Sequence, residues 1–181
     1  KVYDMLYFEA LKGNPDCGGI VSYNCLSGEP VLDISQGRPM LMRLPNSKLT
    51  VADFMRNELY SAFAALKNGN DILLKKENVK LDKISAHGGL YKTEGVGQKI
   101  TAAALNTKVT VMKTAGEGGP WGMAVLALYA VSKRDESLEN YLDNKIFASA
   151  ESVSVDPDLR DVEGFDKYME RYNSAIAVER L

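Results

Sequence analysis

The feature that most constrains the fold is a change of hydrophobic period near the middle of the chain. From residue 83 onward, short apolar runs typical of strands alternate with longer segments that carry a helical pattern. The expected order is a strand over 83–87, a helix over 94–105, a strand over 108–113 and a helix over 121–132. Strands that alternate with helices in this way predict βαβ units, and hence a parallel sheet with right-handed crossovers.

Further elements are expected on both sides of this region. Before it, the pattern predicts helices and strands over 2–11, 18–25, 39–44 and 50–67. The helix over 50–67 has the clearest apolar face, formed by Val51, Phe54, Met55, Leu59, Ala62, Phe63 and Leu66. Thr50 is expected to cap it, with Asp53 in a box-like arrangement. After it, helices are expected over 137–147 and 165–176, separated by a turn at 156–158.

Composition excludes several classes of protein. A chain of 181 residues, 45% of them hydrophobic, predicts one globular domain that buries a sizeable core. Net charge is −2 with scattered lysines and arginines, so no nucleic-acid partner is expected. The sequence has no apolar run of about 18 residues and no visible signal peptide, so no membrane partner is expected and the expected compartment is the cytoplasm. Two cysteines and a lone His87 predict neither a disulfide framework nor a metal site.

A glycine pair, Gly88-Gly89, follows the expected strand over 83–87. Glycines at a strand-to-helix switch let the backbone approach a ligand, and open α/β sheets bind ligands at the carboxyl edge. A tight turn uses the same residues, so both interpretations stay open. Lys92 and Thr93 do not have the GxxxxGK[ST] spacing, which excludes a conventional P-loop.

Other candidate residues have a structural interpretation beside the functional one. A second glycine-rich junction, over 115–120, could hold an anion at a helix N-terminus, but Glu117 would repel it and a tight connection is favoured. Glu29 either orients a ligand or is a solvated turn acid, and His87 either faces a ligand or fills a strand end. Trp121 is expected to pack, and the cysteines are expected to be structural thiols.

Taken in order, these motifs resemble the C-terminal domain of the FGGY family of carbohydrate kinases, within the actin/hexokinase/Hsp70 superfamily. The resemblance covers roughly residues 17–132. The Gly-Glu turn of the family is residues 28–29 here, and its GGGAKS stretch aligns with residues 88–93. Gln98 matches the glutamine that follows, and Glu117 with Gly122 matches the closing motif.

The chain also departs from the family pattern. Leu90 replaces the third glycine, and residues 57–61 read Asn-Glu-Leu-Tyr-Ser where the family reads something like Ala-Val-Leu-Glu-Gly. The Ala-Asp pair after the glutamine appears as Ala102-Ala103, displaced by about one residue. These departures indicate a divergent branch, similar to the pentulose kinases (xylulokinase or ribulokinase) rather than to glycerol kinase.

The resemblance implies an α/β, ribonuclease H-like domain of the actin/hexokinase ATPase type, with a mixed sheet flanked by helices. Residues 1–181 would form the nucleotide-binding domain, a fragment of a longer two-domain kinase. By resemblance, Gly88, Gly89 and Thr93 would border the adenosine of ATP, and Gln98 would support their loop. Mg²⁺ would be bound mainly through the nucleotide and the other domain.

The implied reaction transfers the γ-phosphoryl group of ATP to a hydroxyl of a pentulose such as xylulose or ribulose. Since the aspartate base and most sugar contacts of the family lie earlier in the chain, no catalytic residue is assigned here, and the isolated 181-residue chain is expected to be inactive. The sugar would lie in the cleft with the missing domain, and a homodimer is compatible with this interpretation.

Three alternatives remain at this point. The nearest is a non-catalytic nucleotide-binding sensor or ATPase module of the same superfamily. A Rossmann-like dinucleotide binder would need GxGxxG directly after a strand, which residues 88–93 do not supply. A purely structural interaction domain would bind no nucleotide.

Overall fold

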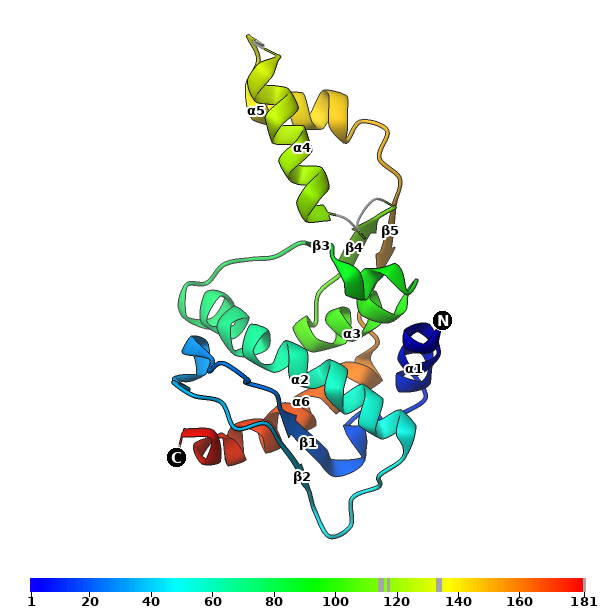
Figure 1. The fold of residues 1–181 in the computed structure, drawn as a ribbon, viewed down its shortest axis with the longest axis vertical. Coiled ribbons are helices and arrows are strands. Elements are labelled where there is room, and N and C mark those ends of the chain that lie inside the picture. Colours follow the sequence, from blue (N-terminus) through cyan, green and yellow to red (C-terminus); the bar gives the residue numbers. More distant parts are fainter. Residues whose placement is uncertain (114–115, 117, 133–134, 181) are drawn as a thin grey trace.

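The computed structural model describes residues 1–113, 116, 118–132 and 135–180 (Figure 1). Its helices are α1 (Val2–Ala10), α2 (Val51–Asp71), α3 (Val96–Leu105), α4 (Gly118–Val131), α5 (Leu138–Tyr141) and α6 (Leu159–Ala175). Its strands are β1 (Ile20–Tyr23), β2 (Met40–Arg43), β3 (Ile84–Ala86), β4 (Val109–Met112) and β5 (Ser152–Val155). Single π-helical turns, Ile72–Lys76 and Leu142–Ile146, extend α2 and α5.

The strands form two separate sheets. β1 and β2 are an antiparallel pair, and β3, β4 and β5 form a second sheet in that spatial order. β3 runs parallel to β4, which confirms the expected βαβ unit with α3 as its connection. β5 pairs antiparallel with β4, so the expectation of a purely parallel sheet is wrong, while the mixed sheet implied by the family resemblance is confirmed.

Helix α2 runs through the middle of the molecule (Figure 1). The β1–β2 pair lies on one side of it and α3 with the three-stranded sheet lies on the other, while α6 crosses behind it and contacts both β1 and α3. α4 and α5 project beyond the sheet, and Val125 is the one buried residue within α4. Among the described residues, no helix combines the length and the apolar character needed to cross a membrane.

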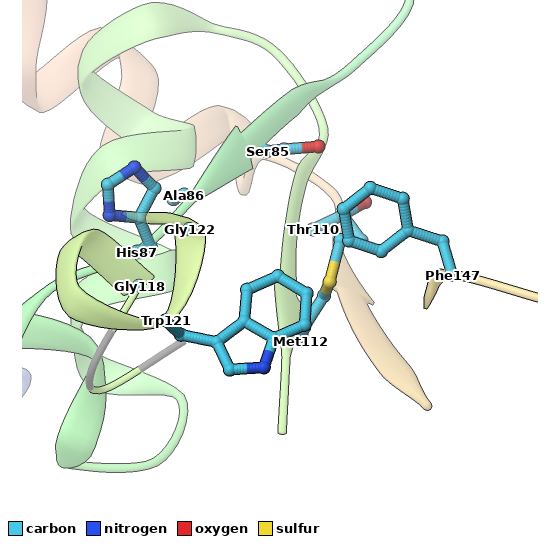
Figure 2. Close-up of a pocket in the computed structure, with 9 residues that line it drawn as sticks. All are labelled: Ser85, Ala86, His87, Thr110, Met112, Gly118, Trp121, Gly122 and Phe147. Carbon is cyan, nitrogen blue, oxygen red and sulfur yellow. The ribbon is translucent and has the colours of Figure 1, made fainter. Parts of the chain in front are cut away.

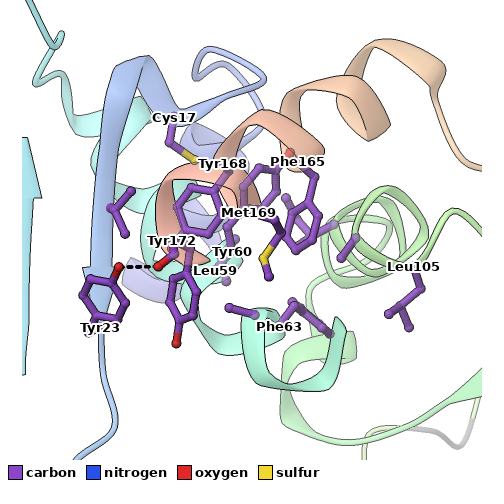
Figure 3. Close-up of a cluster of buried hydrophobic side chains, with 14 of the residues drawn as sticks. Cys17, Tyr23, Leu59, Tyr60, Phe63, Leu105, Phe165, Tyr168, Met169 and Tyr172 are labelled. Carbon is purple, nitrogen blue, oxygen red and sulfur yellow. Dashed lines mark hydrogen bonds between the residues drawn. The ribbon is translucent and has the colours of Figure 1, made fainter. Parts of the chain in front are cut away.

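The core is built where β1, α2, α3 and α6 meet, and it is rich in aromatic rings (Figure 3). The ring of Tyr60 lies edge-on to Phe165, with 4.7 Å between centroids, and 5.4 Å from the ring of Tyr168. The Tyr23 hydroxyl donates to the Tyr172 carbonyl oxygen at 2.5 Å, and burial raises the pKa of Tyr23 to about 12. Since buried rings with satisfied hydroxyls favour one arrangement, this cluster holds α6 against β1 and α2.

The buried face of α2 differs from the expected one. The helix itself is confirmed, but Val51 and Leu66 are 62% and 51% exposed, while Arg56 is buried. The Arg56 guanidinium donates to the carbonyl oxygens of Ala10 and Leu11, each at 3.0 Å, and to a carboxylate oxygen of Asp161 at 2.8 Å. Leu59 and Phe63 of the expected face are buried in the core, so the apolar pattern is confirmed in part. It did not predict the burial of Arg56, because the polar partners of this charged side chain come from α1 and α6.

Thr50 caps α2 as expected, since its hydroxyl oxygen accepts from the backbone N–H of Asp53 at 3.0 Å. The Asp53 carboxylate accepts from the backbone N–H and the side-chain amide of Asn14, at 2.7 and 2.8 Å. Burial raises the pKa of Asp53, but hydrogen bonds from Thr50 and Asn14 outweigh it, so the pKa lies below its ordinary value. Asp53 thus ties the loop before β1 to the start of α2.

The divergent segment of α2 has polar partners on and just after β1. The Asn57 amide donates to the Ser22 hydroxyl oxygen at 2.6 Å, and the Ser22 hydroxyl donates to Glu58 at the same distance. Asn24 donates to Glu58 at 2.9 Å and to the Ser61 hydroxyl oxygen at 3.3 Å. The polar residues of the divergent 57–61 segment therefore form one hydrogen-bonded network between α2 and the end of β1.

Candidate functional site

Two glycine-containing turns meet at one edge of the three-stranded sheet. Because β3 and β4 are parallel, their carboxyl ends lie at the same edge, with Gly88-Gly89 after β3 and Gly116 and Gly118 after β4. A Cβ placed on Gly118 would lie 2.7 Å from the imidazole of His87, and one on Gly116 would lie 3.0 Å from Cγ of Lys92. Because glycine has no side chain, Gly116 and Gly118 can pack closely against Lys92 and His87. Glu117 lies outside the described residues.

The glycine pair itself faces open space. Gly88 has φ 119° and ψ −179°, a conformation essentially restricted to glycine. A Cβ built on either Gly88 or Gly89 meets no heavy atom within 4 Å. Internal packing therefore does not explain Gly89, and the backbone here is accessible to a ligand.

The helical turn Gly89–Lys92, which begins at the second glycine of the pair, packs closely on α3. Leu90 packs against the core, and the Tyr91 hydroxyl lies 2.9 Å from the Thr101 hydroxyl. A Cβ on Gly97 would lie 3.0 Å from Cγ of Leu90 and 2.9 Å from the Tyr91 ring. Sequence reasoning missed Gly97, although an isolated glycine inside a helical pattern is a signal for close packing.

Thr93 and Gln98 are both 5% exposed and already hydrogen-bonded within the protein. The Thr93 hydroxyl donates to a carboxylate oxygen of Asp4 at 2.6 Å. The Gln98 side-chain amide donates to the carbonyl oxygens of Val109 and Val153, at 3.4 and 2.8 Å, and so joins α3 to β4 and β5. Of the four candidate residues, the two glycines are open, while the other two stabilise the elements around them.

A cavity of about 160 Å³ lies beside His87, on the face of the sheet near the start of α4 (Figure 2). Its wall combines Trp121 of α4 with Phe147, whose ring centroids are 5.7 Å apart, and Met112 of β4. Ser85, His87 and Thr110 add polar atoms. Trp121 thus has the packing contact expected of it, but it also lines this apolar cavity on the face of the sheet.

The remaining candidates have structural roles. The Glu29 carboxylate accepts from the backbone N–H of Val31 at 3.1 Å, which supports the turn interpretation. Burial raises the pKa of Cys17 well above its ordinary value and also raises the pKa of Cys25, so both thiols have the properties of unreactive cysteines. Within the described part of the chain, no group of three or more His, Cys, Asp or Glu residues is placed to hold a metal ion.

The arrangement of these elements agrees with comparisons to known proteins. The C-terminal domain of the "FGGY family of carbohydrate kinases" matches residues 2–131. The chain belongs to this family. This FGGY domain has the actin/hexokinase-type α/β fold with helices around a mixed sheet. A comparison with curated proteins gives no match.

Solved structures of FGGY kinases share its fold. A gluconate kinase and a ligand-bound xylulose kinase, both from Lactobacillus acidophilus, each give a TM-score of 0.71 at 18% identity over 96% of this chain. A glycerol kinase from Plasmodium falciparum, solved with ADP, gives 0.68 at 18% identity over 98%. The FGGY domain spans 34% of the length of each of these three proteins.

Proposed function

We propose that this FGGY domain is the nucleotide-binding half of an ATP-dependent sugar kinase. The observation that carries the proposal is the open backbone at Gly88 and Gly89, where a Cβ would meet nothing within 4 Å. The pair lies at the carboxyl edge of parallel strands, where open α/β sheets bind their ligands. The ADP in the glycerol kinase from Plasmodium falciparum is consistent with a nucleotide ligand.

In this proposal each residue has a distinct part. Gly88 provides the backbone angle of the turn, and Gly89 lets the main chain pass close to the adenosine of ATP or ADP. Thr93 closes the loop beside the adenosine. Gln98 supports the loop indirectly, because it holds α3, the helix that follows the loop, against β4 and β5.

The reaction proposed for the full-length protein is transfer of the ATP γ-phosphoryl group to a sugar hydroxyl. Mg²⁺, bound mainly through the nucleotide and the other domain, would neutralise charge on the phosphates. A pentulose such as xylulose or ribulose is the proposed substrate, in line with the xylulose kinases from Lactobacillus acidophilus and Rhodospirillum rubrum among the similar structures. The general base and sugar contacts would come from an N-terminal domain, so the 181-residue chain alone should not phosphorylate xylulose or ribulose.

Calorimetric titration of ATP and ADP into the parent chain and Gly89→Val tests the nucleotide site. The valine side chain would occupy the open space and should weaken binding about tenfold or more, equivalent to about 1.4 kcal/mol. Gly69→Val is the control, since Gly69 is in α2 and its Cβ would meet only a Val31 methyl at 3.7 Å. Equal affinity of the parent and Gly89→Val would refute the assignment.

A further inference from the structure

We propose that Asp4 of α1 is a positioning residue for the nucleotide loop, which we define as residues 88–93. The inference rests on the proposed function, because the loop matters for binding only if a nucleotide occupies it. It assigns a role to the first helix of the chain, which lies outside the family motifs. It also changes the role of the Thr93 hydroxyl from ligand contact to loop anchor.

The contact joins residues that are far apart in sequence. The Thr93 hydroxyl donates to a carboxylate oxygen of Asp4 at 2.6 Å, across 89 positions of the chain. An ionised carboxylate only accepts hydrogen bonds, so Thr93 must be the donor. The hydrogen bond from Thr93 holds the pKa of Asp4 below its ordinary value.

Thr93 occupies the point where the loop enters α3. Its carbonyl oxygen accepts from the backbone N–H of Val96 at 3.3 Å, so its position is linked to the first turn of that helix. With 5% of the residue exposed, little of Thr93 is accessible to a ligand. A hydrogen bond to a charged acceptor is stronger than a neutral one, which suits the hydroxyl to an anchoring role.

Helix α1 is itself fixed to the core. The buried Arg56 of α2 donates to the carbonyl oxygens of Ala10 and Leu11 at the end of α1. Asp4 therefore extends from a helix whose far end is bonded to α2. At the start of the loop, a Cβ on Gly88 or Gly89 would meet no heavy atom within 4 Å, so no side chain packs the pair in place. The carbonyl oxygen of Gly88 accepts from the backbone N–H of Tyr91 at 3.1 Å, which links the pair to the later part of the loop that Thr93 anchors.

A double-mutant cycle on ADP affinity distinguishes anchoring from direct contact. The variants are Asp4→Ala, Thr93→Val and the double substitution, measured by calorimetry at a temperature where all are folded. Each single change should weaken ADP binding about tenfold. The double variant should be no weaker than either single one, because both changes remove the same contact. Thr93→Ser keeps the hydroxyl and should restore affinity.

Glu9→Gln is the matched control. Glu9 is a carboxylate on the same helix whose partner is Lys12 at 2.6 Å, and its substitution should leave ADP affinity unchanged. Hydrogen exchange without ligand provides a second readout. Asp4→Ala should speed exchange of the loop amides while leaving those of α6 unchanged, as expected for local opening.

The outcomes separate the two proposals. Additive losses in the cycle would show that Thr93 contacts the nucleotide itself, and would overturn the positioning role. Full affinity in Asp4→Ala would also overturn it, while the proposed function stands if Gly89→Val still loses binding. If the parent binds no ADP, the proposed function fails. Unchanged loop exchange in Asp4→Ala would then reject the anchor as well.

Discussion

Replacing Gly88 by alanine should destabilise the fold through backbone strain alone, because the added methyl group would meet no neighbouring atom. Gly88 has φ 119° and ψ −179°, and a Cβ there would meet no heavy atom within 4 Å. The whole cost of Gly88→Ala is therefore backbone strain, about 1–3 kcal/mol. Gly89 is equally open but is not among the glycines with positive φ, so Gly89→Ala should change the free energy of unfolding by less than about 0.5 kcal/mol.

Urea unfolding followed by circular dichroism measures both variants. With a slope of about 2 kcal/mol per M urea, the midpoint should fall by about 0.5–1.5 M for Gly88→Ala and stay at the parent value for Gly89→Ala. ADP titration should then show weaker binding by Gly89→Ala despite its parent-like stability. A urea midpoint of Gly88→Ala equal to that of the parent would refute the argument from backbone strain. An equally large fall in the midpoint of Gly89→Ala would refute the claim that its Cβ position is open.

Further predictions concern the supports of the site. Arg56→Met should lower the free energy of unfolding by about 3–5 kcal/mol, because Asp161 and two carbonyl oxygens lose a buried partner; a loss below about 1 kcal/mol in urea unfolding would contradict this. Gly97→Ala should cost about 1–3 kcal/mol despite its gain in helix propensity, because the new Cβ would lie 3.1 Å from the Leu90 carbonyl oxygen; a higher melting temperature would refute it. The pKa of Asp53 is lower in the folded state, so its stabilisation is present above the unfolded value of about 3.9 and is lost as pH falls through the folded value. In Asp53→Asn the free energy of unfolding should therefore fall less steeply as the pH is lowered into the acidic range. An unchanged pH dependence would contradict the hydrogen bonds assigned to Asp53.

The order of β3, α3 and β4 could be predicted because its signal is local. Their observed bounds lie within two residues of the expected ranges, since the change of hydrophobic period and the glycines mark each junction. β5 was missed although its four residues alternate serine with valine, which is the pattern of a strand, because so short a run is a weak signal. Its antiparallel pairing with β4 joins segments about 40 residues apart and could not be read from the local sequence.

The candidate site shows the same division. Gly88 and Gly89 could be identified because glycines after a strand are visible in the sequence. Their support could not, because the bond between Asp4 and Thr93 joins residues brought together only by tertiary packing. The burial of Arg56 on α2 could not be predicted for a related reason, since the polar partners that make it a core residue lie on α1 and α6.

The most direct test of a nucleotide site at the glycine pair is amide chemical-shift mapping of the chain during an ADP titration. The proposed site predicts the largest shifts at Gly88, Gly89 and the residues beside them, with the amides of α6 unchanged. Saturable shifts confined to the β1–β2 pair or α6, or no shifts at all, would contradict it.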